Sequence, residues 1–329
     1  MLNTVRIGLV LWLAAAASPG YGADAACPPA PRQPAPEVLQ SAMRNAQDHG
    51  YLWRISRDGG SSYLYGTMHV GKPEWMFPGP KVMAALRAAD TVALELDVLD
   101  PEILARTRKG MAASHGAVLP EPLVQRLRQQ AKALCVPYDT LAKAAPELQV
   151  TMLGIVAARW EGLDAGFAAD AMLASLGHAG KKNMVSLETP ESQLQALLMT
   201  TPQETAAFVE DSLEELESSR ARQLLRRQAL AWANADYAEM DHYADWCDCL
   251  RNDIEREMMK RMLDERNPAM AERIDALHQS GKRVFAAVGS LHLFGPQGLP
   301  ALLAKRGYQV ERIDLRPEGR KPAHKGGAT

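Results

Sequence analysis

The sequence has almost no net charge and, beyond its first residues, no long apolar run. Its 37 Lys and Arg residues nearly balance 39 Asp and Glu residues, which leaves a formal net charge of −2. This balance gives no electrostatic basis for binding nucleic acid or an anionic membrane, so we expect neither as a partner. With 329 residues, 47% of them hydrophobic, the chain can bury a sizeable core.

The sequence also lacks the local motifs of several large enzyme classes. It contains no Gly-x-x-x-x-Gly-Lys-Ser/Thr phosphate loop and no Gly-x-Gly-x-x-Gly dinucleotide motif. It contains no His-Glu-x-x-His zinc motif and no Gly-x-Ser-x-Gly nucleophile motif. Nucleotide binding, zincin chemistry and serine-hydrolase chemistry therefore have no local support.

The first 25 residues have the pattern of a secretory signal peptide. Arg6 supplies a positive charge, residues 7–17 form an apolar run, and the Ala-Asp-Ala at residues 23–25 is a small-x-small cleavage site. The apolar run is too short to span a bilayer, which disfavours the alternative of a membrane anchor. We expect removal of residues 1–25, a periplasmic or secreted protein, and no stable membrane anchor after cleavage.

Four cysteines remain after this cleavage: Cys27, Cys135, Cys247 and Cys249. In an oxidising compartment, an even number of cysteines favours disulfides. Because one residue separates Cys247 from Cys249, a direct bridge between them would be strained. We therefore expect each of them to pair with Cys27 or Cys135, in an order that the sequence leaves open.

A rival interpretation treats the same segment as a metal cluster. Asp241, His242 and Asp245 lie just before Cys247 and Cys249 and could join them as ligands. Exported thiols rarely stay reduced, so we favour disulfides.

Apolar runs of strand length alternate with segments of helix length along the chain. The Asp-Gly-Gly turn at residues 58–60 lies between two alternating apolar runs, which predicts a β-hairpin. We also expect strands at residues 91–96, 183–188, 283–288 and 308–313. This alternation predicts an α/β fold with a mostly parallel central sheet flanked by helices. Residues 101–265 are mainly helical, and we interpret them as an insertion or cap.

These elements make up one expected domain at residues 40–316. A proline-rich lead-in at residues 26–39 precedes it. The tail at residues 317–329 is rich in Gly and Pro, and we expect it to be disordered.

The most informative pattern is a repeated Gly-x-x-His motif, which ends in His69 and again in His292. Each copy follows a predicted strand, and Glu95 and Glu188 lie at the ends of two others. If these strands are parallel neighbours, all four side chains meet at one edge of the sheet, where α/β folds place ligands. Two imidazoles and two carboxylates suit a divalent transition metal that activates water, and one carboxylate could instead act as general base.

Each of these residues also has a simpler interpretation. A single histidine after a strand is more often a surface residue than a ligand. Glu95 could form a salt bridge to a core arginine, and Glu188 could favour the N-terminus of the following helix. We interpret Arg266 as an anion or oxyanion clamp over the site, with an exposed arginine at a helix end as the alternative.

Seven short segments, taken in order, resemble the TraB/PrgY/GumN family, bacterial relatives of the Tiki proteins, and GumN-like exported members in particular. These segments are residues 64–69 with Pro78, 89–97, 162–164, 186–189 with Gln193, 266–267, 287–295 and 298–299. The resemblance implies an α/β fold similar to that of erythromycin-esterase-like and ChaN-like proteins. It also implies a metal-dependent protease that uses manganese or cobalt, with His69, His292 and Glu95 at its centre. Glu188 and Arg266 inherit this expectation less directly.

We therefore expect a metal-dependent hydrolase that acts as a peptidase. Its metal ligands would be His69, His292 and Glu95, and its other catalytic residues Glu188 and Arg266. The cofactor would be Mn, Co or Zn, and the substrate a peptide or another small molecule. The alternative is a non-enzymatic envelope protein that binds haem or another ligand in the same cleft, as the ChaN-like resemblance allows.

Overall fold

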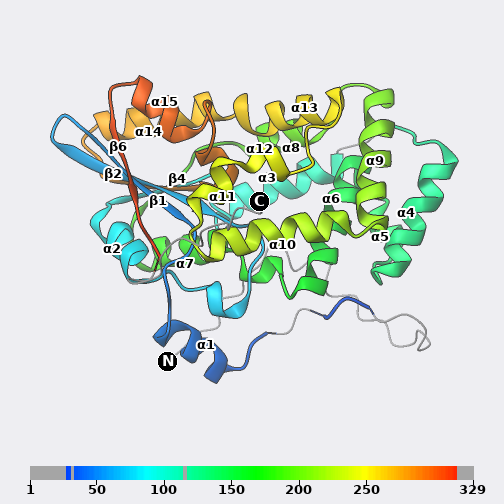
Figure 1. Ribbon diagram of the computed structural model, residues 1–329, viewed down its shortest axis with the longest axis horizontal. Helices are drawn as coiled ribbons and strands as arrows, with labels where there is room; N and C mark the ends of the chain where they lie inside the picture. The colour runs from blue at the N-terminus through cyan, green and yellow to red at the C-terminus, as the bar shows by residue number, and fades with distance from the viewer. Residues whose placement is uncertain (1–26, 31–32, 114–116, 317–329) are drawn as a thin grey trace, which may run out of the picture.

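The computed structural model describes residues 27–30, 33–113 and 117–316. The expected signal peptide at residues 1–25 and the expected tail at residues 317–329 lie outside the described residues. Figure 1 shows a sheet with covering helices at one end of the molecule and a group of helices at the other. In the described part of the chain, no helix is both long enough and apolar enough to cross a membrane.

The expected hairpin is present as strands β1 (Tyr51–Arg57) and β2 (Gly60–Thr67), which pair antiparallel. Asp58 and Gly59 form its turn, and both have positive φ angles of 52° and 77°. Two consecutive left-handed residues give a turn whose twist matches that of the strands, and Asp-Gly is a favoured sequence for it.

Six strands form one sheet in the order β4-β3-β5-β2-β1-β6. The remaining strands are β3 (Thr91–Leu94), β4 (Asn183–Ser186), β5 (Val284–Gly289) and β6 (Gln309–Ile313). Strands β4, β3, β5 and β2 are parallel neighbours, whereas β1 is antiparallel to both β2 and β6. The expected α/β fold with a mostly parallel sheet is confirmed.

Helices cover the central strands, which is why β3 and β5 are buried along their whole length and apolar except for Thr91. The helices that contact the sheet include α7 (Ala169–Ala179), α14 (Asn267–Gln279) and α15 (Leu299–Lys305). The segment between β2 and β3 contains η1 (Pro73–Trp75) and α2 (Pro80–Ala88), and α1 (Pro36–Arg44) packs against η1. A short helix, η5 (Ser290–Leu293), follows β5 directly.

Two helical runs lie on either side of β4 in the sequence, so the chain returns to the sheet once within the helical region. The first comprises α3 (Pro101–Ala113), α4 (Glu121–Ala133), α5 (Tyr138–Leu141), α6 (Pro146–Ala157), η2 (Ala158–Glu161) and η3 (Ala165–Phe167), followed by α7. The second comprises α8 (Pro190–Leu197), α9 (Pro202–Glu217), α10 (Arg220–Ala233), α11 (Tyr237–Asp241), α12 (Tyr243–Trp246), α13 (Asp253–Met259) and the π-helix η4 (Lys260–Asp264).

Helices α4, α5, α6 and α9 share a hydrophobic cluster of their own, separate from that of the sheet, whereas α7, α10 and α11 contribute to the sheet cluster. Leu127 of α4, Leu153 of α6 and Val209 of α9 are fully buried in it. The sheet cluster instead gathers around strand residues such as Leu64 and Phe285. The helical region at the far end from the sheet in Figure 1 therefore does not depend on sheet contacts for its core.

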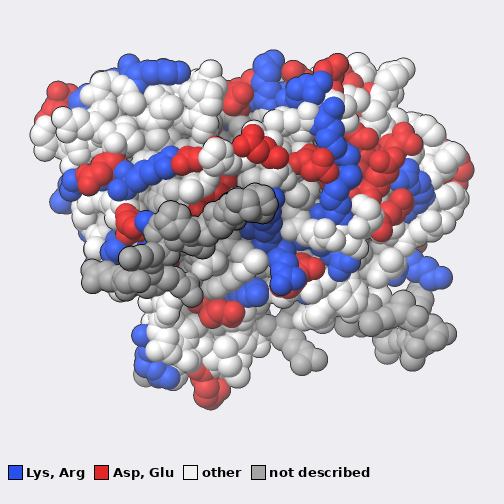
Figure 2. Space-filling view, in the orientation of Figure 1, with Lys and Arg blue, Asp and Glu red and all other residues white. Residues whose placement is uncertain are grey.

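Charged side chains of both signs are interspersed over the face seen in Figure 2. Many form exposed pairs, such as Arg54 with Glu311 and Arg312 with Asp241. Exposed pairs of this kind contribute little to stability, because water screens the attraction and ordering the side chains costs entropy.

The cysteines pair as Cys27–Cys135 and Cys247–Cys249, so the expected cross-pairing of the last two cysteines is wrong. The reason is the conformation of Asp248, whose φ of 53° turns the chain back on itself. The Cα atoms of Cys247 and Cys249 are consequently 5.1 Å apart, within the usual range for a disulfide. Because both sulfurs are bonded to each other, the rival metal cluster has no thiolate ligands.

A buried carboxylate, Asp275 of α14, ties the helix to two other segments. It accepts a hydrogen bond from the Tyr308 hydroxyl (2.8 Å) and pairs with Arg57 (2.9 Å) and Arg306 (3.1 Å). Burial alone would raise the pKa of Asp275, but hydrogen bonds from Tyr308, Gln279 and Arg306 outweigh burial and lower this pKa.

Replacing this carboxylate should destabilise the fold in a pH-dependent way. Asp275→Asn should lower the free energy of unfolding at neutral pH by about 2 to 4 kcal/mol, since it leaves buried donors without their charged acceptor. Because the folded-state pKa is lowered, this stabilisation is present above the unfolded pKa and is lost as pH falls through the folded pKa. Urea denaturation should therefore separate variant from wild type at pH 7 but much less in strong acid.

The exposed Asp245→Asn variant is the matched control, and its unfolding free energy should change by less than about 0.5 kcal/mol. A difference between Asp275→Asn and wild type that stays constant from neutral to acidic pH would contradict the assignment.

Candidate active site

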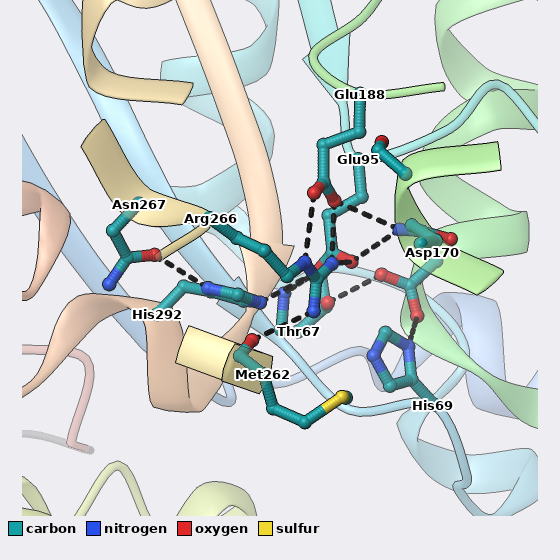
Figure 3. A network of polar contacts seen from close by, with 12 residues as sticks. Thr67, His69, Glu95, Asp170, Glu188, Met262, Arg266, Asn267 and His292 are labelled. Carbon is teal, nitrogen blue, oxygen red and sulfur yellow. Dashed lines mark hydrogen bonds and ion pairs between the residues drawn. The ribbon is translucent and has the colours of Figure 1, made fainter. Parts of the chain in front are cut away.

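Four strand ends bring the expected site residues together at one edge of the sheet. His69 follows β2, Glu95 follows β3, Glu188 follows β4 and His292 follows β5. Because β4, β3, β5 and β2 are adjacent and parallel, their carboxyl ends lie side by side. Figure 3 shows the four side chains around Arg266, which comes from the segment before α14.

Glu95 occupies the centre of this group. Its Oε1 accepts a hydrogen bond from the Gly289 backbone N–H (2.6 Å) and lies 3.7 Å from His292 Nε2. Its Oε2 accepts hydrogen bonds from Arg266 Nη2 (2.9 Å) and Gln193 Nε2 (2.9 Å). The two oxygens therefore differ: Oε2 is held by two side chains, whereas Oε1 is held by one backbone N–H and faces the histidines.

The charge of Glu95 is stabilised although the side chain is nearly buried. Burial alone would raise the pKa of Glu95. The neighbouring His292, His69 and Arg266 side chains and the Gly289 N–H outweigh burial and hold this pKa at about 2. Glu95 is thus ionised at neutral pH and is a weak proton acceptor.

Arg266 binds both carboxylates from between them. Its Nε donates to Glu188 Oε1 (2.8 Å) and its Nη2 donates to Glu188 Oε2 (2.5 Å) and Glu95 Oε2, while Nη1 donates to the Met262 carbonyl (2.9 Å). Only 10% of the Arg266 side chain and 6% of the Glu188 side chain are exposed. The interpretation of Arg266 as an exposed helix-end residue is therefore wrong, and its donors bind the protein's own carboxylates.

Both imidazoles have their Nδ1 atoms bound to an oxygen acceptor. His292 Nδ1 lies 2.6 Å from Asn267 Oδ1, and the Asn267 amide is oriented by donating to the Gln297 carbonyl (2.8 Å). His69 Nδ1 lies 2.9 Å from Asp170 Oδ2. Since a carbonyl or carboxylate oxygen accepts, each Nδ1 carries the hydrogen, and each Nε2 is left for the centre of the site.

The two histidines nevertheless differ in environment. His292 is 96% buried, and burial lowers its pKa to about 4. The attraction of Asp170 raises the pKa of His69 to about 9, against the effect of desolvation. About two-thirds of the His69 side chain is exposed, so water screens this attraction.

One point beside Gly289 lies close to the side chains of Glu95, His69 and His292. A Cβ on Gly289 would be 3.2 Å from both Glu95 Oε1 and His69 Nε2, and 3.7 Å from His292 Cδ2. The φ of Gly289 is −51°, which other residues adopt easily, so the backbone does not require glycine here. The absence of a side chain at Gly289 leaves the space in which these groups converge.

The first glycine of the repeated motif has a different role. A Cβ on Gly66 would lie 3.1 Å from Ser290 Oγ and from Leu293 Cδ1. Gly66 therefore allows β2 to pack closely against η5, whereas Gly289 keeps the site open. The two motifs resemble each other in sequence but use their glycines for different purposes.

The sequence pattern did not identify three of the residues that hold the site. Asp170 lies in the first turn of α7, where an acid commonly serves only the helix terminus. It binds His69 and also accepts a hydrogen bond from the Thr67 hydroxyl (2.5 Å). Gln193 and Asn267 belong to the motifs noted above, but nothing in the sequence indicated which side chains they bind.

The converging side chains do not form a complete set of metal ligands in their present positions. Among the described residues, no three His, Cys, Asp or Glu side chains are grouped so that they could hold a metal ion as they stand. Both Glu188 oxygens bind Arg266, and Oε2 also accepts a hydrogen bond from Gln193 (3.0 Å). The side chains that face the shared point are His69, Glu95 and His292.

These features define an α/β protein with imidazoles and a carboxylate gathered at the carboxyl edge of a mainly parallel sheet. Residues 51–312 match the model of the TraB/PrgY/gumN family, and the chain belongs to this family, as the sequence motifs predicted.

Two relatives give the degree of similarity. The uncharacterized protein YbaP of Shigella flexneri is 26% identical over 244 residues, which cover 74% of this chain and 87% of that protein. The uncharacterized protein YbaP of Escherichia coli (strain K12) is 26% identical over 243 residues, or 73% of this chain and 87% of that protein. No solved structure gives a significant match.

Replacing the Arg266 guanidinium with an uncharged side chain should destabilise the fold. Arg266→Met should lower the free energy of unfolding by about 3 to 5 kcal/mol, because it leaves Glu95 and Glu188 buried without a counterion. Adding Glu188→Gln to this variant removes one of the two unpaired charges, so the double variant should be more stable than Arg266→Met alone. Urea denaturation followed by circular dichroism measures both changes.

The control is Arg256→Met, which breaks an exposed pair with Asp253 and should change stability by less than about 1 kcal/mol. Equal stability of the Arg266→Met and Arg256→Met variants would show that the buried ion pairs of Arg266 contribute no more to stability than an exposed pair.

Proposed function

We propose that this protein is a metal-dependent hydrolase. One observation carries the proposal: His292 Nε2 faces Glu95 Oε1 at 3.7 Å, while His292 Nδ1 is bound to Asn267. With the hydrogen on Nδ1, Nε2 presents a lone pair to a carboxylate oxygen in a buried site. Two acceptors facing each other repel, and a cation bound by both would turn this repulsion into attraction.

The chemistry of the donors fits a first-row divalent ion such as Mn, Co or Zn. His69 and His292 would bind through Nε2 and Glu95 through Oε1. Asp170 and Asn267 support this assignment, since ligating histidines usually donate their other ring N–H to a carboxylate or carbonyl oxygen. An ion held there would lower the pKa of bound water and polarise a substrate carbonyl.

The remaining residues would orient the ligands and leave space for the ion. The low pKa of Glu95 suits a ligand better than a general base. Arg266 and Gln193 would fix Glu95 through Oε2, so that Oε1 stays directed at the histidines. Glu188 would keep Arg266 in place by accepting two hydrogen bonds from it. Gly289 would leave room for the ion or the substrate.

We further propose that the substrate is a peptide or a similar small molecule and that the protein works in the periplasm or outside the cell. The peptide class follows from the family resemblance. The two disulfides support an exported location, because disulfides persist in oxidising compartments.

A second candidate function is binding of haem or another ligand without catalysis. The exposed His69 ring favours it, since a ligand could reach this imidazole from solvent. Haem titration separates the two functions. A Soret shift that is lost in His69→Ala, together with no peptidase activity in the presence of Mn, Co or Zn, would support binding alone.

Hydrolysis should depend on both histidines and on the metal. In a fluorogenic peptide library with added Mn, Co or Zn, the wild type should show activity that a chelator removes. His69→Ala combined with His292→Ala should lower this activity by at least about a hundredfold, because two of three metal donors are lost. The exposed His242→Ala variant is the matched control and should retain full activity. Activity that is unchanged by chelator, or by the double substitution, would refute the proposal.

Filling the space at Gly289 tests the location of the centre. Gly289→Ala should abolish metal binding measured by calorimetry, because its Cβ would lie at the point where the donors converge. The backbone angle tolerates alanine, so circular dichroism should show a native fold. Gly154→Ala, where a Cβ would contact nothing within 4 Å, is the control and should bind metal normally. Normal binding by Gly289→Ala would place the ion elsewhere.

A further inference from the structure

A second chemical centre is formed by the Cys247–Cys249 disulfide, in the turn between α12 and α13. The bond closes a ring over a single residue, Asp248, and joins two positions in the same turn. The other disulfide, Cys27–Cys135, joins positions 108 residues apart in the sequence. The two bonds therefore have different structural consequences.

The short ring stabilises the fold little. A disulfide stabilises a protein mainly by restricting the unfolded chain, and this effect decreases as the closed loop becomes shorter. The Cys247–Cys249 bond ties neither α12 nor α13 to another part of the molecule. Its presence is thus poorly explained by stabilisation of the fold.

The geometry of the turn favours opening of the ring. Asp248 is held in the left-handed region at a φ of 53°, which is uncommon for residues other than glycine, and opening of the ring frees it to leave this region. The Cys249 backbone N–H also lies 3.2 Å from Cys247 Sγ, to which it donates a hydrogen bond. Such a donor stabilises negative charge on that sulfur, so Cys247 is the better leaving thiolate.

The two cysteines also differ in exposure, and the more exposed one is not the one whose sulfur accepts the N–H hydrogen bond. Only 3% of Cys247 is exposed, whereas Cys249 is partly exposed. An incoming thiolate can therefore approach Cys249, and the sulfur it displaces is the one that receives the N–H hydrogen bond. The accessible sulfur and the leaving sulfur are correctly arranged for exchange.

We propose that Cys247 and Cys249 form a thiol–disulfide exchange centre that oxidises dithiols of peptides or proteins. A substrate thiolate attacks Cys249 Sγ, a substrate–Cys249 disulfide forms, the Cys247–Cys249 bond breaks, and Cys247 leaves as the thiolate. The second substrate thiolate then attacks the substrate sulfur of this mixed disulfide and releases Cys249. The substrate gains one disulfide, the protein gains two thiols, and glutathione disulfide can restore the protein. This centre is independent of the proposed hydrolase site.

Redox titration of the intact wild-type chain tests the proposal without any substitution. The protein is equilibrated in buffers of varied glutathione to glutathione disulfide ratio, alkylated, and digested, and peptide mass spectrometry measures each disulfide. Cys247–Cys249 should be reduced at a ratio [GSH]²/[GSSG] at least about tenfold lower than Cys27–Cys135, or about 30 mV for this two-electron couple. The circular dichroism spectrum should stay native. Equal resistance of the two disulfides would overturn the proposal.

Single cysteine variants test the assigned direction of attack. Cys247→Ser leaves Cys249 as a free thiol, and Cys249→Ser leaves the buried Cys247. Mixed-disulfide formation with 5,5′-dithiobis(2-nitrobenzoate) should be at least about tenfold faster for Cys247→Ser, because its thiol is accessible. A reduced dithiol peptide should be oxidised stoichiometrically by the wild type and by neither variant. A faster reaction of Cys249→Ser, or no oxidation of the dithiol peptide by wild type, would refute the mechanism.

Discussion

The Arg266 guanidinium makes the rest of the site possible. Two carboxylates, Glu95 and Glu188, are nearly buried at the edge of the sheet, and buried charges are stable only when they are paired and hydrogen-bonded. Arg266 binds both of them with a planar set of donors that a lysine could not supply. By holding Glu95 through one oxygen, it leaves the other oxygen directed at His292 and at Gly289. The orientation of the central carboxylate is therefore set by an ion pair with an arginine that is distant from it in the sequence.

Much of this arrangement could be predicted from the sequence because local patterns determine it. Asp58 and Gly59 specify a turn with two left-handed residues, which defines the hairpin. Short apolar runs give the strands, and their separation by helices predicts parallel neighbours. Once the strands are parallel, their carboxyl ends must meet, so the gathering of His69, Glu95 and His292 follows from topology without knowledge of any side-chain contact.

Other features could not be predicted, because they depend on backbone conformation or on distant contacts. The bridge between Cys247 and Cys249 requires the left-handed conformation of Asp248, and nothing in the residue itself specifies that conformation. Asp170 has the sequence context of an ordinary acid in the first turn of a helix. It reaches His69 only because the start of α7 lies against the segment after β2, where the Ala169 N–H donates to the Met68 carbonyl.

The separate core of helices α4, α5, α6 and α9 has a consequence for how the molecule responds to mutation. Residues that share no partners and lie far apart contribute to stability almost independently. Leu127 and Val209 belong to one cluster and Leu64 and Phe285 to the other, so a repacked helical core need not move the strands. Helices α4, α5, α6 and α9 can thus change in shape and surface, and acquire new recognition properties, while the residues at the strand ends keep their geometry. One part of the chain can therefore tolerate substitutions that the residues at the strand ends cannot.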